Sequence, residues 1–287
     1  MHVPVMLAEC LEYLGVKPDG LYLDATTGLA GHLRAIAQRL QPPGMVLACD
    51  RDRESLEIAR KNTADLAGKI RFYQVSFARL EEMIEAEGLP RLDGLLADLG
   101  VSKYQLTESE RGFSLMADGP LDMRLDRAQK ETAADIVNFT SETGLADLIF
   151  ELGEERRSRK IARAIVRARP IHTTGQLAKL IESAAPRTER IHPATRTFMA
   201  LRIAVNRELE ELTALLASLP RIVKAGGRAV ILTFHSLEDR RVKQAFQAMA
   251  RDGRARILTR HVVRPTEQEV QGNPASRSAK LRAVEMI

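Results

Sequence analysis

The sequence predicts an α/β fold in which a parallel sheet is interrupted by a helical insertion. Short apolar runs that end near an Asp alternate with segments of helical spacing over the first hundred residues. No convincing strand follows in residues 104–207, and strand character returns at residues 228–234. Because strands and helices that alternate at this spacing imply right-handed crossovers, we expect the strands to form one parallel sheet.

The strands of the first part are predicted from apolar runs. We expect strands at residues 21–23, 45–49, 70–75 and 92–99. The first ends at Asp24, the second ends at Asp50, and the fourth contains Asp98 near its end. Residues 33–40 have helical spacing and stop at Pro42-Pro43-Gly44, and a further helix is expected around residues 56–59.

The insertion is predicted to be helical throughout. Helices are expected at residues 145–152, 159–169, 176–184 and 196–219, and the returning strand follows the turn Ala225-Gly226-Gly227. A chain of 287 residues with 45% hydrophobic residues favours two domains, or one domain with a large insertion. We expect residues 1–103 and 208–287 to form one domain and residues 104–207 an inserted, all-helical one.

The charge balance is mildly basic. A net charge of +5 and a pI near 9.3 are compatible with a polyanionic partner, although many proteins of this charge bind no nucleic acid. Aromatic residues make up only 4% of the chain and Trp is absent. Electrostatic docking of RNA with one or two inserted bases is therefore favoured over a broad stacking platform.

The cellular compartment and the absence of a structural metal are predicted from features that the sequence lacks. Cys10 and Cys49 lie far apart in apolar runs, which favours buried free thiols over a disulfide. The start of the chain has no basic n-region, and no apolar stretch approaches the ~20 residues that a membrane span needs. We expect a cytoplasmic protein. No His/Cys cluster has metal-ligand spacing, so no structural metal is expected.

Two motifs in the first part indicate a nucleoside cofactor. The glycine turn at residues 24–32 follows the first strand, so backbone N–H groups there can face an anionic or polar ligand. Asp50 lies 26 residues after Asp24, near the offset at which doubly wound folds place an acid for ribose hydroxyls. A plain turn and a helix cap are the structural alternatives. NAD and S-adenosylmethionine both fit this pattern, and the absence of GxGxxG favours the second.

Asp98 closes the fourth strand in Asp98-Leu99-Gly100-Val101-Ser102. Open α/β sheets bind ligands outside the carboxyl ends of their strands, so Asp98, Asp50 and the glycine turn should border one crevice. The alternative is that Asp98 only caps a helix.

Five further strings are specific in combination and occur in a fixed order. They are DLGVS at 98–102, ERGFS at 110–114, GPLDMR at 119–124, HPATRTF at 192–198 and FHSLEDR at 234–240. With these strings the chain resembles the RsmH (formerly MraW) family, whose members methylate N4 of a decoding-centre cytosine in 16S rRNA. The resemblance runs from His2-Val3-Pro4-Val5 to Leu281-Arg282, essentially the whole chain.

The resemblance implies a Rossmann-like class I methyltransferase sheet, S-adenosyl-L-methionine as cofactor, and a helical insertion that helps to hold the RNA. It also implies an assembled small ribosomal subunit as the substrate. The cofactor residues carry over to Ala30, Gly31, His32, Asp50, Phe77, Asp98 and Gln105.

The chain departs from the family pattern at a few positions. Family members usually have Gly where this chain has Ala30, and Ala is costly there if its φ is positive. Lys103-Tyr104 stands where Ser-Pro is common, and Met199 stands where Gln is common.

The chemistry of the expected reaction assigns roles to two residues. The lone pair of cytosine N4 is delocalised into the ring, so a site must turn it toward the methyl group and accept an amino hydrogen. Asp98, or a backbone carbonyl beside it, is the expected acceptor, and a cofactor-only role for Asp98 is the alternative. His235 follows a strand and could contact the base or a phosphate, but orientation of the helix around Leu237 is favoured.

The RNA contacts are expected in the insertion. Asp122 and Arg124 are predicted to shape the base pocket, and basic residues are predicted to face phosphates. The basic candidates are Arg156, Lys160, Arg163, Arg196 and Arg202. The target base must be unstacked to reach the crevice, so single-stranded or splayed RNA is expected. Two other functions stay open, namely methylation of another acceptor and an RNA-binding assembly factor without activity.

Overall fold

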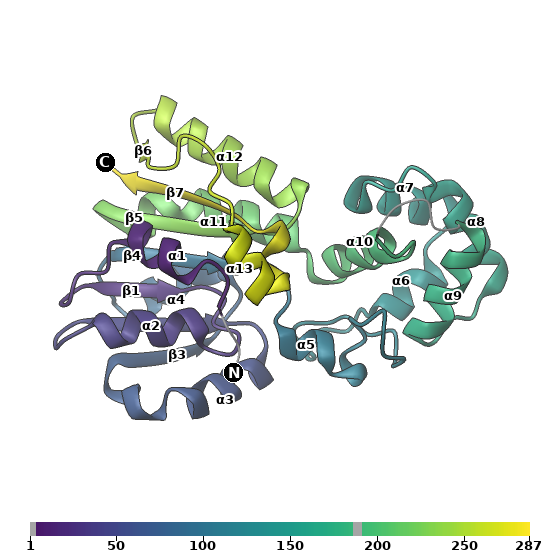
Figure 1. Cartoon of the computed structure of the whole chain (residues 1–287), viewed down its shortest axis with the longest axis horizontal. Helices are drawn as coiled ribbons and strands as arrows, with labels where there is room; N and C mark the ends of the chain where they lie inside the picture. Colours follow the sequence, from purple (N-terminus) through teal and green to yellow (C-terminus); the bar gives the residue numbers. More distant parts are fainter. Residues whose placement is uncertain (1–3, 186–190) are drawn as a thin grey trace. The chain divides into compact units, whose positions relative to one another are not determined.

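The computed structural model describes residues 4–185 and 191–287, so His2 and Val3 of the family resemblance lie outside the described residues, as does the side chain of Lys103. The chain divides into two compact units (Figure 1). Unit 1 comprises residues 1–100 and 209–287, and unit 2 comprises residues 101–208. Among the described residues, no helix has the length and apolar character needed to cross a membrane.

Unit 1 contains a seven-stranded sheet in the order β3-β2-β1-β4-β5-β7-β6. The strands are β1 (Leu21–Asp24), β2 (Met45–Asp50), β3 (Ile70–Gln74), β4 (Leu92–Asp98), β5 (Val223–Thr233), β6 (Ala255–Ile257) and β7 (Lys280–Met286). The first five are parallel, and β7 runs antiparallel to β5 and β6. The predicted α/β fold with an interrupted parallel sheet is confirmed.

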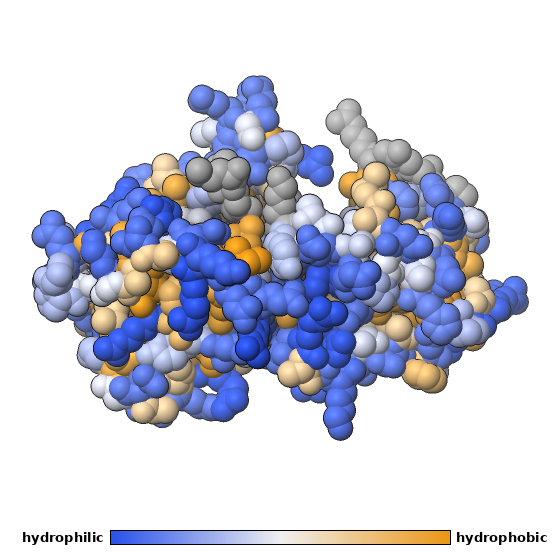
Figure 2. All heavy atoms as spheres, turned by 90° about the horizontal axis from the view of Figure 1, so that it is seen from below, coloured by the Kyte–Doolittle hydropathy of each residue, from blue (hydrophilic) through white to orange (hydrophobic). Residues whose placement is uncertain are grey.

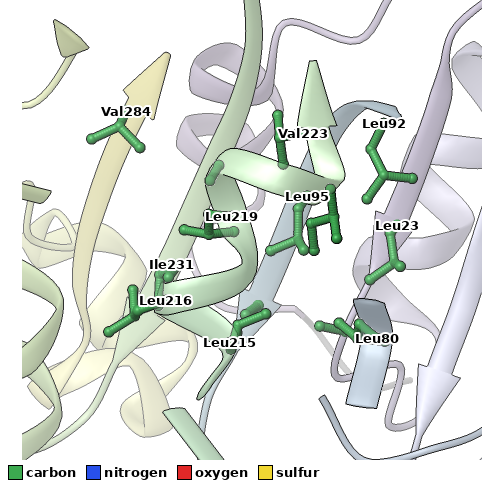
Figure 3. Packing of buried hydrophobic residues seen from close by; sticks show 14 of the residues in the cluster. Leu23, Leu80, Leu92, Leu95, Leu215, Leu216, Leu219, Val223, Ile231 and Val284 are labelled. Atoms are coloured by element: carbon green, nitrogen blue, oxygen red, sulfur yellow. The ribbon is translucent and has the colours of Figure 1, made fainter. Parts of the chain in front are cut away.

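Helices cover both faces of this sheet because successive strand residues point to opposite sides. In β1, Tyr22 packs in one apolar cluster and Leu23 in another. The Tyr22 cluster contains residues of α1 (Leu7–Leu14), α2 (Gly31–Arg39) and α3 (Arg53–Asn62). The Leu23 cluster contains residues of α4 (Leu80–Ala86), α11 (Glu208–Ile222) and α12 (Ser236–Arg251), and Figure 3 shows its packing. A short helix, α13 (Glu267–Gly272), precedes β7.

Unit 2 is helical. Its helices are α5 (Lys103–Thr107), α6 (Ala133–Phe139), α7 (Glu142–Gly153), α8 (Ser158–Ala168), α9 (Thr174–Ala184) and α10 (Thr195–Asn206). They enclose a core of their own, in which Leu145, Ile161 and Leu177 are fully buried. The described part of unit 2 has no strand, only an isolated bridge between Pro120 and Thr173.

Two element predictions need correction. The helix predicted at residues 196–219 is broken at Arg207, whose φ of 50° is left-handed and ends α10 before α11 begins. The strand predicted at residues 228–234 begins at Val223. Its Gly226, with φ of 74°, lies where the register between β4 and β5 shifts, so the predicted turn is a bulge inside the strand.

Candidate active site

Three acids end neighbouring strands of unit 1. Asp24, Asp50 and Asp98 are the last residues of β1, β2 and β4, and the sheet order places β1 between the other two. The chain proceeds from β1 outward to β3 on one side and from β4 outward on the other. The β1–β4 boundary is therefore the switch point at which open α/β sheets bind ligands.

The Asp98 carboxyl group is held in an environment that disfavours its ionised form. Its backbone N–H donates to Oγ1 of Thr26 at 2.6 Å, which fixes the end of β4. Oδ1 is buried and has no hydrogen-bond partner among the described residues. Burial, with the charges of Asp24 and Glu238, raises the pKa of Asp98 to about 8.

The carboxylate oxygens of Asp24 and Asp50 differ in how many hydrogen bonds they accept. Asp24 is 1% exposed, its Oδ1 accepts the N–H of Thr26 at 3.2 Å, and its Oδ2 is buried without a partner in the described chain. Burial raises the pKa of Asp24 to about 7. Both oxygens of Asp50 accept backbone N–H groups, from Gly28 at 2.8 Å and Asp52 at 2.9 Å. Burial outweighs these bonds and raises the pKa of Asp50 to about 6.

Gly31 and His32 begin α2 against the start of the described chain. A Cβ on Gly31 would lie 3.0 Å from Cβ of Pro4, so glycine permits the close approach of that segment. The buried ring of His32 has Nε2 2.9 Å from the carbonyl oxygen of Val5 and Nδ1 3.6 Å from Oδ2 of Asp98. The side chain of His32 therefore touches the acid at the end of β4.

Ala30 is the N-cap of α2 and has φ of 71°, in the left-handed region. An L-residue other than Gly costs roughly 1–2 kcal/mol in this conformation. Because the φ of Ala30 is positive, Ala in place of the usual Gly of the family is expected to cost stability at this position.

Two further predicted cofactor residues, Phe77 and Gln105, are distant in sequence from the three acids. Phe77 begins a short 3-10 helix, Phe77–Arg79, and packs partly buried against the Leu23 cluster. Gln105 is buried and belongs to unit 2. There its Oε1 accepts the N–H of Ser102 at 2.8 Å and completes a capping box at the start of α5.

His235 is the N-cap residue of α12. Its Nε2 lies 3.1 Å from Oε1 of Glu238, and Oε2 of Glu238 accepts the N–H groups of Phe234 at 2.9 Å and His235 at 3.3 Å. Sequence reasoning missed the part that Glu238 and Asp24 play beside Asp98. Asp24 could have been found because it is an acid at the end of a predicted strand. Glu238 shows in the sequence only as an acid in the first turn of a predicted helix, which does not indicate a neighbour of Asp98.

The whole chain, residues 1–287, matches the MraW methylase family. The chain belongs to this family. The family resemblance expected from the five motifs is therefore confirmed.

Members and structures similar to the chain include both close and distant proteins. The ribosomal RNA small subunit methyltransferase H of Solibacter usitatus is 56% identical over 286 residues, covering 100% of both chains. The protein of the same name from Acidobacterium capsulatum is 51% identical over 293 residues, covering 99% of this chain and 98% of its own. A solved structure from Clostridium thermocellum, described as a candidate rRNA-methylase, matches 100% of both chains with a TM-score of 0.52 at 10% identity, which shows the fold alone.

Two of the motifs that carry the family resemblance, ERGFS and GPLDMR, contact each other within unit 2. The buried guanidinium of Arg111, from ERGFS, donates to the carbonyl oxygens of Arg124 at 3.1 Å and Leu125 at 3.2 Å. Gly112 has φ of 71°, and a Cβ there would lie 2.3 Å from the carbonyl oxygen of Pro120 in GPLDMR. These two motifs thus form one packed loop structure.

Asp122 and Arg124, which were predicted to shape the base pocket, pair with each other. Nε and an Nη of Arg124 donate to the two carboxylate oxygens of Asp122, each at 2.8 Å. The other Nη of Arg124 donates to the carbonyl oxygens of Arg127 and Gln129. Burial alone would raise the pKa of Asp122, but the bonds from Arg124 lower it, so the pair stays ionised.

The basic RNA candidates divide into two groups. Arg202 forms a bidentate pair with Glu208 at 2.9 Å, and Arg196 lies 4.0 Å from the buried carboxylate of Glu155. Arg156 and Lys160 are exposed and line a hollow of about 420 Å³ at the start of α8. Arg163 is also exposed, one helical turn further along α8, with Oε1 of Glu142 3.4 Å away.

Proposed function

We propose that this protein transfers a methyl group from S-adenosyl-L-methionine to the N4 amino group of a decoding-centre cytosine in 16S rRNA. The observation that carries the proposal is the partnerless buried Oδ1 of Asp98 at the switch point of the sheet. Such an oxygen is an available acceptor at the place where the fold binds ligands. A relative that is 56% identical over the full chain is named a small subunit rRNA methyltransferase, which supports the substrate class.

The acids of unit 1 fit the proposed cofactor. S-adenosylmethionine brings a sulfonium and an ammonium group, and it supplies the methyl group. Partnerless carboxylate oxygens on Asp24 and Asp98 are costly without a cation and favourable beside one. Asp50 keeps lone pairs for the ribose hydroxyls, and Ala30, Gly31 and His32 begin the helix that follows the glycine turn. We extend the cofactor site to Phe77 on the family resemblance, and the cofactor role of Gln105, a residue of unit 2, stays a prediction from that resemblance.

Asp98 is the proposed acceptor of the N4 proton. As the N–C bond forms, positive charge develops on N4, and an adjacent carboxylate stabilises it and takes the proton. A cofactor-only role for Asp98 predicts that its loss would weaken cofactor binding without a separate effect on the transfer step. We assign His235 to orientation of α12, because it occupies the N-cap and contacts Glu238.

Unit 2 is the proposed RNA-holding domain, corresponding to residues 104–207. Its exposed basic residues at the start of α8 provide a cationic surface, and Phe150 beside them is 56% exposed. Figure 2 shows one face of the molecule, where hydrophilic side chains predominate and apolar ones form small separate groups. RNA is bound through cationic surfaces with occasional aromatic contacts, the two features found together at the start of α8. Arg196, Arg202, Asp122 and Arg124 then act by shaping unit 2.

The deciding experiment is transfer of labelled methyl from S-adenosylmethionine to small ribosomal subunits that lack the modification. We expect N4-methylcytidine as the labelled nucleoside, identified by mass spectrometry. Naked 16S rRNA, assayed in parallel, tests our proposal that the assembled cytoplasmic subunit is the substrate. Label in another nucleoside would overturn the N4-cytosine assignment. Cofactor binding without label in either substrate would favour an assembly factor.

A further inference from the structure

We propose that the hollow at the start of α8 binds one ribonucleotide of the RNA, with its phosphate at the N-terminus of the helix and its base against Phe150. This inference rests on the proposed function and names a subsite for its substrate. The hollow has a volume of about 420 Å³, within the range of about 300–1,000 Å³ that small-ligand sites occupy. Its lining comes from α7, α8 and the turn between them, all in unit 2, so the site belongs to one compact body.

The first turn of α8 offers backbone donors to an anion. Arg157 occupies the N-cap position, and no side chain caps the helix there. The N–H groups of Arg159 and Lys160 have no acceptor among the described residues, as is usual in the first turn of a helix. Because α8 has 11 residues, its aligned peptide dipoles place partial positive charge at this end. A phosphate group therefore fits this end of the hollow.

The hydroxyl group of Ser158 independently indicates a ligand. Ser158 lines the hollow and is only 4% exposed, yet its hydroxyl group forms no hydrogen bond within residues 4–185 and 191–287. A buried hydroxyl group without a partner costs free energy, and most buried polar side chains in proteins are paired. The N–H of Ser158 already donates to the carbonyl oxygen of Glu155 at 3.2 Å, so the hydroxyl group is what remains. A phosphate oxygen at the start of α8 would accept its hydrogen.

Cationic side chains at the same end of the hollow are available to the phosphate. Arg156, Arg159 and Lys160 line the hollow, are exposed, and form no ion pair with an acid in the described part of the chain. Arg157 differs, because its Nε lies 3.2 Å from Oε1 of the buried Glu155, which also accepts the N–H of Arg157 at 2.9 Å. Glu155 thus fixes the turn before α8 and neutralises one cation, and the other cations remain for phosphates.

Helix α7 supplies the side of the hollow that faces the base and the ribose. Phe150 lines the hollow and is 56% exposed, so a base stacked on its ring would cover apolar surface. Asp147 also lines the hollow and lies three residues earlier, on the same face of α7. Its carboxylate repels phosphate but accepts a hydrogen bond from a ribose 2′-hydroxyl group, which DNA lacks. An acid and an aromatic ring opposite the cations of α8 thus favour a ribonucleotide over a bare anion.

The bound nucleotide belongs to an RNA strand, because the cationic surface continues beyond the hollow. Arg163 and Arg167 are exposed further along α8. Nε of Arg163 lies 3.4 Å from Oε1 of Glu142, but the two side chains are 60% and 45% exposed, and such surface pairs contribute little. Phosphates next to the bound nucleotide would therefore meet further cations, whereas a free mononucleotide would leave these cations unused.

The first test places a fluorescent probe in the hollow. The chain has no Trp, so Phe150→Trp gives the full-length protein a single one. We expect a single-stranded oligocytidylate of about eight nucleotides to quench its fluorescence, because a base stacks on the indole ring. Phe139→Trp is the matched control, since Phe139 ends α6, is 82% exposed and does not line the hollow. Equal quenching in the two variants, or none in Phe150→Trp, would overturn the proposal.

The second test measures the affinity of variants for the same RNA by fluorescence anisotropy of a labelled strand. Phe150→Ala should weaken binding about tenfold or more, whereas Phe139→Ala should stay within about twofold of wild type. Ser158→Ala should weaken binding about three- to tenfold and leave the urea midpoint unchanged or higher, because no internal hydrogen bond is lost and Ala favours the helix. A lower urea midpoint with unchanged affinity would show that Ser158 is only structural, and the inference would be wrong.

Two competitors identify the ligand. Oligodeoxycytidylate should bind more weakly than the RNA, and Asp147→Ala should reduce the ratio of the two affinities. An unchanged ratio would contradict the ribose contact. Cytidine 5′-monophosphate should quench Phe150→Trp only at concentrations about 100-fold higher than the RNA, and equal affinities would make a free nucleotide the ligand and overturn the proposal. These measurements need no methylation, so they decide the subsite even if the protein methylates no ribosomal subunit and the proposed function fails.

Discussion

Asp24 and Asp98 end neighbouring parallel strands, and the negative charge of Asp24 adds to burial in raising the pKa of Asp98. Each carboxyl group has a buried oxygen without a partner among the described residues. The cofactor-free protein therefore stores unfavourable electrostatic energy at the switch point of its sheet. A bound cation would relieve it.

Replacement of Asp98 by Asn should stabilise the protein at high pH. Folding raises the pKa of Asp98 from 3.8 to about 8, so the acid destabilises the fold progressively as pH rises from about 4 to about 8. Asn cannot ionise, so the free energy of unfolding of Asp98→Asn relative to wild type should increase over that range, by on the order of a few kcal/mol. Urea unfolding at pH 4, 6 and 8 measures it. A difference independent of pH would show that Asp98 keeps an ordinary pKa.

Affinity for S-adenosylmethionine should rise with pH. A cation binds the ionised form of Asp98, and below pH 8 most molecules must first release that proton. We expect the dissociation constant to fall up to about tenfold per pH unit between pH 6 and 8, with proton release on binding. Calorimetry in buffers of different ionisation enthalpy measures both quantities. Asp98→Asn should bind more weakly at pH 8 and keep only the shallower dependence that Asp24 and Asp50 contribute, whereas an equally steep dependence in that variant would exclude Asp98 as the main titrating group.

Ala30→Gly should stabilise the protein. The left-handed backbone of residue 30 favours Gly by roughly 1–2 kcal/mol, against about 0.5–1 kcal/mol for the greater entropy of Gly in the unfolded chain. The expected net gain is about 0.5–1 kcal/mol in unfolding free energy. Ala35→Gly, inside the same helix α2, is the control and should cost about 1 kcal/mol. A loss of stability in both variants would contradict the strain at Ala30.

Gly112→Ala should destabilise unit 2. The added Cβ would lie 2.3 Å from the carbonyl oxygen of Pro120 in a residue whose φ is 71°, so both a clash and backbone strain arise. We expect a loss of about 2 kcal/mol or more, together with faster amide exchange in residues 119–125. Gly272→Ala has no atom within 4 Å of its Cβ and should change stability by less than about 0.5 kcal/mol. Similar stabilities for the two variants would mean that the loop can relax around the new Cβ.

The double variant Arg156→Ala, Lys160→Ala should bind RNA more weakly than wild type, and its affinity should depend less steeply on salt concentration. If both side chains contact phosphates, the slope of log affinity against log salt should fall by about 1.4 for single-stranded RNA. Lys243→Ala, Arg251→Ala removes the same charge from exposed positions on α12 and controls for net charge. Equal slopes for the two double variants would mean that only the net charge matters, and the α8 surface would then not be the RNA contact.

The sequence predicted the elements that local pattern determines. Strands ending at Asp24 and Asp50, the helix after the glycine turn and the helical character of residues 104–207 all follow from apolar spacing and turn residues. It did not predict the short strand β6 or the antiparallel β7, because strands of this kind are defined by their partners. The break at Arg207 was also missed, since nothing in the local pattern requires a left-handed residue there.

What the sequence determined by itself was the fold class, the family and the acids at the strand ends, because periodicity and motif order are local properties of the chain. Only the tertiary structure decided that Arg124 pairs with Asp122, that Arg202 pairs with Glu208, and that His32 lies between Val5 and Asp98. Whether a charge is neutralised or left without a partner depends on neighbours that are distant in sequence. Burial then sets the free energy of its ionised form.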